Sequence, residues 1–208
     1  IGSYVLGLGF VVSPQVADEF VSRDRRNLDV LFPYVNGEDV TSRPDQSGSR
    51  WVINFHNWPL TRGAAGTWNS GDGVMRKQWL RSGAVPNDYP GPVASDYPDC
   101  LEVVTRLVMP ERQRRRPDGT YQLRNPLPTR WWQYGDKRPD LYRTIAGYSR
   151  VLVTPLVTKH LVVAFLNTRQ VFSHMIAVLA FDQDGVFGLL QSTIHELWVR
   201  QRASTLET

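Results

Sequence analysis

The stretch Arg150-Val-Leu-Val-Thr-Pro-Leu-Val-Thr-Lys-His-Leu-Val-Val-Ala-Phe-Leu166, followed by Gln170-Val-Phe-Ser-His-Met-Ile-Ala-Val-Leu-Ala-Phe181, decides the fold class of this chain. Its three runs are dense in Val, Leu, Ile and Phe and are too short and too β-branched for helices, so we expect strands. The segments 158–160 and 167–169 that separate the runs are of hairpin size. We therefore predict a sheet core built as a meander.

The first connection, Thr158-Lys159-His160, is a polar and basic tip on this apolar base. A functional side chain gains accuracy when a rigid element holds the loop that carries it. Any hairpin tip is polar, however, so composition alone does not separate a binding loop from an ordinary solvated turn.

The rest of the chain supplies shorter elements around this core. Apolar patterns predict strands at residues 3–12, 29–35 and 51–55, and helices at 15–21, 74–81, 96–109, 140–146 and 184–200. Residues 60–95 are rich in Gly, Pro, Ser, Asn and Asp and are expected to form a loop-rich insertion. The fold class is therefore expected to be α+β, with a mixed or antiparallel sheet, β-hairpins and a few flanking helices. We expect one domain over residues 1–208.

Length and composition bound the cellular setting. A chain of 208 residues with 41% hydrophobic content can bury a sizeable core. Cys100 is the only cysteine, so an internal disulfide is impossible and a reducing cytoplasm fits best. No apolar run reaches 18 residues and no charged lead precedes an apolar segment at the N-terminus, so we expect neither a membrane partner nor a signal peptide. Because Ile1 already lies in a strand-like pattern, we expect the chain to be part of a longer protein.

Positive charge is concentrated in one segment. Residues 1–100 carry 9 basic and 11 acidic side chains, residues 111–150 carry 10 and 4, and residues 151–208 carry 4 of each. A local cationic surface of this kind suits a polyanion, although a solvated basic loop has the same composition. The segment also interleaves cations with aromatic residues, in the run Arg130-Trp131-Trp132-Gln-Tyr-Gly-Asp-Lys137-Arg138.

Sequence patterns of several enzyme classes are absent. There is no Gly-x-x-x-x-Gly-Lys loop, no His-Glu-x-x-His, and a single cysteine excludes a cysteine zinc cluster. Glu38-Asp39 lacks a third ligand at a useful spacing, so a backbone-capping role is favoured over a metal site. The segment 125–127, Asn-Pro-Leu, lacks the second proline and the aromatic residue of an amino-methylating motif. We expect no catalytic residue, metal site or cofactor in this chain.

Many short motifs nevertheless occur in the order of one family. They are Phe32-Pro-Tyr-Val-Asn-Gly-Glu-Asp-Val40 with Ser42-Arg43-Pro44, Trp51-Val-Ile-Asn-Phe55, Tyr97-Pro98, Pro110-Glu111-Arg112, Trp131-Trp132-x-Tyr-Gly-x-x-Arg138-Pro139, Arg150-Val-Leu-Val-Thr-Pro155, Gln170-Val-Phe-Ser173 and Ile194-His195-Glu196-Leu197-Trp198. The chain, apart from roughly residues 60–95, resembles the target recognition domain of MmeI-like (type IIG/IIL) restriction–modification enzymes and related adenine-specific DNA methyltransferases of phage defence.

The resemblance implies a function and a set of partners. The chain would recognise a sequence in double-stranded DNA. A methyltransferase domain of the same polypeptide, in a bacterial cytoplasm, would bind S-adenosylmethionine and methylate adenine; an endonuclease activity of the parent enzyme is also possible in this family. The loop at Thr158, Lys159 and His160 falls where the family reads bases, and it is shorter than the family's Ser-Ser-Glu-x-Arg form.

Physical chemistry suggests how the remaining residues would serve this function. Lysine, histidine and threonine can read base edges in the major groove, while arginine and lysine side chains elsewhere neutralise phosphates. The expected phosphate contacts are Arg112, Arg114, Arg115, Arg116, Arg130, Lys137 and Arg138. Trp131 and Trp132 are expected either to stack on DNA or to pack in the core.

A second hypothesis is a protein-docking module. Trp58, Trp68 and Trp79, together with the 60–95 insertion, would form its surface. Ionic strength separates the two hypotheses, because phosphate-driven binding weakens steeply with salt and an aromatic docking surface does not. A standalone hydrolase is disfavoured by the absence of a nucleophile–base pair.

Overall fold

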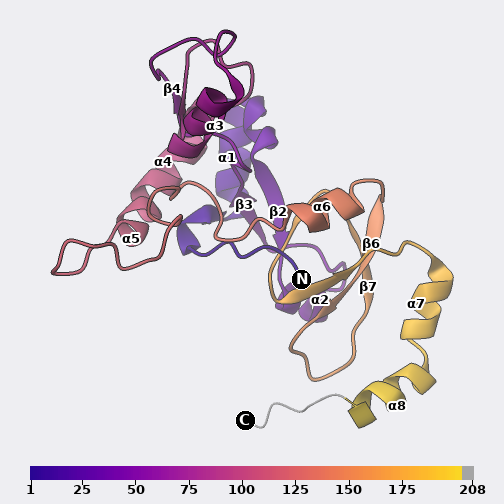
Figure 1. Cartoon of the computed structure of the whole chain (residues 1–208). Coiled ribbons are helices and arrows are strands. Elements are labelled where there is room, and N and C mark those ends of the chain that lie inside the picture. The colour runs from indigo at the N-terminus through magenta and orange to yellow at the C-terminus, as the bar shows by residue number, and fades with distance from the viewer. Residues whose placement is uncertain (203–208) are drawn as a thin grey trace. The chain divides into compact units, whose positions relative to one another are not determined.

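The computed structural model describes residues 1–202, which form two compact units (Figure 1). The first unit combines Ile1–Tyr4, Pro33–Ser49 and the chain from Arg138 onward. The second combines Val5–Phe32 with Arg50–Lys137. Each unit is therefore assembled from segments that are far apart in sequence.

The first unit is built on strand β6 (Arg150–Pro155). Strand β7 (Ala164–Asn167) pairs with one edge of β6 and strand β9 (Ile176–Leu179) with the other, both antiparallel. Three successive residues of β6, Val151 to Val153, have no exposed surface, which is the pattern of a strand covered on both faces. The expected α+β class with antiparallel hairpins is confirmed.

The predicted meander is correct for its first hairpin and wrong for its third run. The run divides into β8 (Val171–Phe172), which pairs in parallel with the end of β2 (Leu31–Val35), and β9, which returns to β6. The turn lies at Ser173, whose amide donates to the Val35 carbonyl at 2.9 Å and whose carbonyl accepts from Ile176 at 3.0 Å. The β6–β7 connection also covers residues 156–163, more than the three-residue tip expected from the sequence.

Helices α2 (Gly37–Ser42) and α6 (Pro139–Ile145) bury apolar side chains in the same core as this sheet. Val40 of α2 and Ile145 of α6 are at most 2% exposed. Burying one such side chain stabilises a fold by about 1.5–3 kcal/mol. The core of the first unit consists of Val35, Val40, Ile145, Val151, Val153, Ala164, Leu166, Phe172 and Ile176.

The C-terminal helix expected at residues 184–200 is divided. Helix α7 (Asp184–Leu190) ends before Ser192, and α8 (Thr193–Arg202) begins after it. The Ser192 hydroxyl accepts a hydrogen bond from the His195 amide at 3.2 Å, so it caps the second helix. Neither helix buries a residue, and Ile194 is 81% exposed. The prediction of one amphipathic helix with Val186, Leu190, Ile194 and Leu197 on a packed side is therefore wrong: the helix is broken at Ser192, and Leu197 is also exposed, at 58%.

The second unit contains a short sheet and several helices. Strands β1 (Val11–Val12) and β3 (Arg50–Ile53) pair in antiparallel orientation. Just past β3, the Asn54 amide donates a hydrogen bond to the Val30 carbonyl at 2.8 Å. Its remaining elements are η1 (Leu8–Phe10), α1 (Pro14–Arg23), η2 (Arg25–Asp29), η3 (Ala94–Asp96), α4 (Pro98–Leu107) and α5 (Met109–Arg112). Burial raises the pKa of Cys100 on α4 to about 12, so the thiol is a packed side chain and not a nucleophile.

The 60–95 insertion is more ordered than its composition suggests. Strands β4 (Thr61–Arg62) and β5 (Ala84–Val85) pair in parallel, and α3 (Gly73–Ser82) connects them. The helix is capped by Asp72, whose carboxylate accepts from the Val74 and Met75 amides at 2.9 and 2.7 Å. Trp79, Val85 and Val93 form a small core of their own. Within residues 1–202, no helix is long and apolar enough to cross a membrane.

Arg112 is a structural residue of the second unit. Only 2% of it is exposed, and its guanidinium donates to four backbone carbonyls: Trp131, Gln133, Val5 and Leu6. Burial lowers the pKa of Arg112 to about 10, so the group stays charged at neutral pH. The planar fork of arginine lets one side chain hold two segments of backbone together.

We predict that Arg112→Met lowers the free energy of unfolding by about 3 kcal/mol, because it leaves buried carbonyls without a donor. Chemical denaturation monitored by tryptophan fluorescence measures the effect. Arg114→Met is the control, since Arg114 is exposed and should change stability by no more than about 0.5 kcal/mol. Equal stability of the two variants would contradict the structural role of Arg112.

Candidate nucleic-acid interface

The three residues expected to read bases lie together on the β6–β7 loop (residues 156–163) of the first unit, and all three are exposed. The Thr158 hydroxyl donates to the His160 carbonyl at 2.9 Å and accepts from the His160 amide at 3.4 Å. These bonds close a small turn around Lys159. No hydrogen bond or ion pair engages the Lys159 ammonium within the described part of the chain, so it is available to a ligand.

The sheet extends into the base of this loop. Pro155 pairs with Ile176 at the end of β6, and the Leu156 amide donates to the Met175 carbonyl at 2.9 Å. Beyond this bond, Leu156 and Val157 are 49% and 59% exposed. The tip therefore begins two residues past the hydrogen-bonded ladder, and exposed apolar side chains at Leu156 and Val157 lie next to its cationic one.

A hollow of about 620 Å³ lies between the tip and helix α2. The tip forms one wall of the hollow, and the first turns of α2 form the other. Both walls belong to the first unit. The residues that line the hollow are Asn36, Gly37, Glu38, Thr41, Ser42, Val157, Thr158, Lys159, His160 and Met175. Sequence reasoning did not connect α2 with the tip, because only the folded topology brings residues 36–42 beside residues 157–160.

Helix α2 is fixed firmly enough to serve as a wall. Asn36 and Asp39 form a reciprocal capping box, with bonds of 2.9 and 3.0 Å between each backbone amide and the other side chain. The expectation that this acidic pair caps backbone is confirmed for Asp39. A Cβ atom on Gly37 would lie 3.3 Å from Pro155, so the helix packs closely on the end of β6.

A second exposed cationic element lies in the second unit, in the loop that follows α5 (Figure 1). Residues 114–122 form a basic hairpin. The Arg116 backbone amide donates to the Thr120 carbonyl at 2.8 Å, and the Gln122 backbone amide donates to the Arg114 carbonyl at 2.9 Å. Gly119 has φ +82° at the turn, a conformation that glycine adopts without strain. The hairpin is thus ordered by its own backbone hydrogen bonds.

The arginines of this segment have different roles. Arg115 lies on the Tyr121 ring, 4.4 Å from its centroid, and donates to the Gly119 carbonyl at 2.7 Å and the Tyr121 hydroxyl at 3.1 Å. Arg116 donates to the Gln122 carbonyl at 3.3 Å. The exposed side chains of Arg114 and Arg124 make no ion pair or side-chain hydrogen bond within residues 1–202. Arg124 was not among the expected phosphate contacts, although the charge count of its segment included it.

Three other expected phosphate contacts are partly engaged by the protein. Arg130 donates to the carbonyls of Leu80 and Arg81 at 3.1 and 3.3 Å, and Lys137 donates to Gln133 Oε1 at 3.1 Å. Burial, and then the charge of Arg130, lower the pKa of Lys137. Arg138 belongs to the first unit, where its guanidinium lies 5.9 Å from the Tyr4 ring centroid.

The buried members of the expected set pack in the core. Arg112 cannot reach a phosphate, because its guanidinium is enclosed and bound to four carbonyls, so we remove it from the set of DNA contacts. Trp131 and Trp132 are 7% and 2% exposed, and the Trp132 indole donates to the Trp58 carbonyl at 3.0 Å. Of the two alternatives for these tryptophans, burial favours packing over base stacking.

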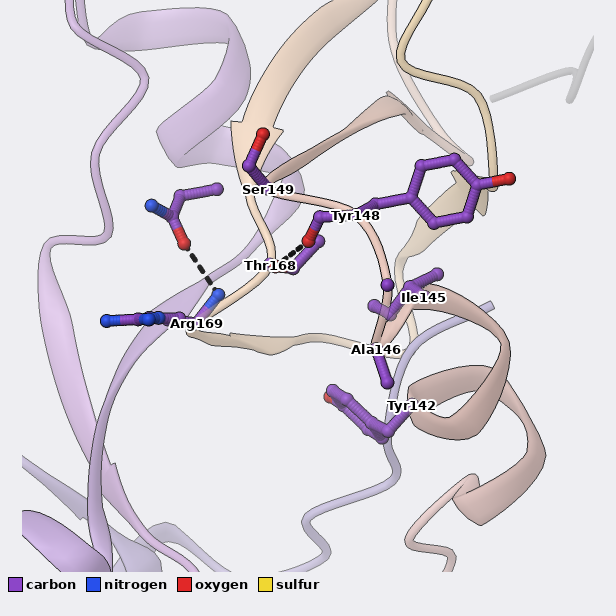
Figure 2. Close-up of a pocket in the computed structure, with 9 residues that line it drawn as sticks. Tyr142, Ile145, Ala146, Tyr148, Ser149, Thr168 and Arg169 are labelled. Atoms are coloured by element: carbon purple, nitrogen blue, oxygen red, sulfur yellow. Dashed lines mark hydrogen bonds between the residues drawn. The ribbon is translucent and has the colours of Figure 1, made fainter.

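A further hollow of about 510 Å³ lies between the end of α6 and the turn after β7 (Figure 2). Two of its polar side chains are used by the fold: the Thr168 hydroxyl donates to the Tyr148 carbonyl at 2.7 Å, and Asn167 Oδ1 accepts from the Arg169 amide at 2.6 Å. In Figure 2 the Arg169 and Tyr148 side chains extend in opposite directions. These side chains do not converge on a ligand position.

No cluster of three histidine, cysteine or carboxylate side chains suited to a metal ion occurs in residues 1–202. Two of the histidines there have local partners: His174 stacks on Tyr4 with ring centroids 4.1 Å apart, and His195 Nδ1 lies 2.8 Å from the Leu190 carbonyl.

Comparison with known proteins gives a likeness of fold. No protein-family model matches the chain, and no curated protein matches it. The structure is similar to that of the type IIL restriction-modification enzyme MmeI, solved in complex with DNA, with a TM-score of 0.57 and 13% sequence identity. The similarity covers 99% of this chain and 22% of the MmeI chain, so this chain spans about a fifth of that enzyme. The fold of this chain is thus similar to that of part of a restriction–modification enzyme.

Proposed function

We propose that this chain recognises a sequence in double-stranded DNA on behalf of an adenine-specific, S-adenosylmethionine-dependent DNA methyltransferase of a restriction–modification or phage-defence system. The observation that carries the proposal is the exposed tip at residues 158–160, which stands on a hydrogen-bonded sheet and borders an open hollow. The likeness of fold to MmeI, a DNA-bound enzyme in its solved structure, supports this assignment.

The tip has the chemistry to read base edges. Lys159 donates to the guanine acceptors O6 and N7, and the histidine and threonine beside it can donate or accept. A loop held at both ends by antiparallel strands presents these groups with little loss of conformational entropy on binding. In this role Thr158, Lys159 and His160 supply sequence specificity.

The basic hairpin, together with Arg124 just after it, supplies affinity without sequence specificity. Arg114 and Arg124 are exposed cations with no described intramolecular partner, so they can neutralise phosphates directly. Arg115 holds the hairpin through Tyr121 and can still present one face of its guanidinium. Arg116, Arg130, Lys137 and Arg138 complete the proposed phosphate set.

The chemistry of methylation would come from another domain of the same polypeptide, which would bind S-adenosylmethionine and take the target adenine out of the duplex. A bacterial cytoplasm is the corresponding compartment.

The docking hypothesis is weakened by the structure of the insertion, because Trp79 is 9% exposed and the ring of Trp68 lies 5.9 Å from the ring of Trp79 in the same small core. These rings stabilise the insertion and leave little aromatic surface for a partner.

We predict that the double variant Arg114→Ala/Arg124→Ala binds all duplexes more weakly and to the same extent. Removing two phosphate contacts should reduce the slope of log affinity against log salt by about 2. Fluorescence anisotropy with several duplexes over a range of salt concentrations measures both quantities. Arg25→Ala removes an exposed arginine of η2 and serves as the control. A loss confined to one DNA sequence would contradict the phosphate role.

We predict that Lys159→Ala changes the recognised sequence at one position and leaves the salt slope within about one unit of its wild-type value. Selection from a library of randomised duplexes, followed by sequencing, identifies the motif for the wild-type and variant chains. Recovery of an identical motif with identical preference at every position would show that Lys159 does not read bases.

A further inference from the structure

The hollow beside the tip has a second wall with a different chemistry. Lys159 and His160 on the first wall bring hydrogen-bond donors, whereas Glu38 on α2 brings a carboxylate, which only accepts. Thr41 and Ser42 add hydroxyl groups to the same wall. Donors and acceptors therefore border one hollow within a single unit.

The Glu38 carboxylate is available to a ligand, whereas the carboxylate of its neighbour Asp39 is bound to the protein backbone. Asp39 is 3% exposed and accepts from the Asn36 and Ser49 amides at 2.9 and 3.2 Å, which fixes it to the fold. Glu38 is exposed, and no hydrogen bond or ion pair involves its carboxylate anywhere in residues 1–202. The capping box thus uses one acid of the pair and presents the other.

The position of Glu38 is rigid as well as open. A Cβ atom added to Gly37 would lie 3.3 Å from Pro155, so the helix start packs closely on β6, and Val40 is buried in the core of the unit. Glu38 and Thr41 are three residues apart and share one face of the helix. The Thr41 hydroxyl donates back to the Gly37 or Glu38 carbonyl, each at 3.2 Å, so within the protein it acts as a donor and remains able to accept.

A carboxylate at a DNA-binding surface is repelled by the phosphates. It therefore favours DNA binding only if it accepts a hydrogen bond from a specific donor on the DNA. In the major groove that donor is an exocyclic amino group, N4 of cytosine or N6 of adenine. Adenine places its N7 acceptor next to this amino group, where it repels a carboxylate, and cytosine has no such acceptor at its edge. Cytosine is therefore the better partner for Glu38.

We propose that Glu38 is a specificity-determining residue that accepts a hydrogen bond from the N4 amino group of a cytosine, across the hollow from Lys159. A guanine paired with this cytosine offers acceptors to Lys159, so one C·G pair satisfies both walls. This inference rests on the proposed function and adds α2 to the elements that read sequence.

The test is Glu38→Gln, examined by selection from randomised duplexes and by affinity for duplexes that carry each base pair at the chosen position. We expect the variant to lose roughly tenfold discrimination in favour of C·G at one position. Replacing that C·G pair should weaken wild-type binding roughly tenfold more than it weakens the variant's binding, because Lys159 can still contact the guanine of the pair in both proteins; this difference is the coupling energy of a double-mutant cycle. Glu102→Gln, which removes an exposed carboxylate of α4, is the control with the same charge change and should keep the wild-type motif.

The outcomes separate the inference from the proposed function. If the wild-type chain binds no duplex selectively, the proposed function is wrong. If the wild-type chain selects a motif and Glu38→Gln selects the same one with unchanged preferences, only the role of Glu38 is overturned. A variant that binds every sequence more tightly by one common factor would also overturn it, because Glu38 would then act through phosphate repulsion alone.

Discussion

The pairing of β6 with two antiparallel neighbours is the constraint on which the first unit depends. Val153 of β6 faces Ala164 of β7 on one side and Val178 of β9 on the other. A strand in this central position cannot shift by one residue without exchanging the side chains packed on its two buried faces and breaking its pairing with both neighbours. The position at which the β6–β7 loop leaves the sheet is therefore fixed, and Lys159 lies four residues beyond the end of β6.

The same strand also fixes the second wall of the hollow. Pro155 ends β6, pairs with Ile176 and packs against Gly37 at the start of α2. Because Pro155 both pairs in the sheet and packs on Gly37, the end of β6, from which the loop with the tip begins, lies at a fixed distance from the start of α2. Recognition of a base pair by groups on two elements requires this kind of preorganisation, since a hydrogen bond loses most of its energy when its partners are misplaced.

Local signals predicted many elements and missed the long-range partners. Ser13 and Pro14 mark the start of α1, and Pro110 accompanies the break after α4, since capping and proline effects act within a few residues. The split of the third apolar run could not be predicted, because β8 pairs with β2, more than 130 residues earlier in the chain. The hollow was missed for the same reason, as its walls come from residues 36–42 and 157–160. Charge counting found the basic segment but could not tell the buried Arg112 from the exposed Arg114.

The central claim is that the tip meets bases while the basic hairpin meets phosphates. Photo-crosslinking to a bound duplex tests it most directly, with a photoreactive amino acid placed at position 159 or at position 114. We expect crosslinks from position 159 to map to bases at recognised positions, and crosslinks from position 114 to map to the sugar–phosphate backbone whatever the sequence. Crosslinks from position 114 alone, with none from position 159 to any base, would contradict the claim that this loop reads DNA.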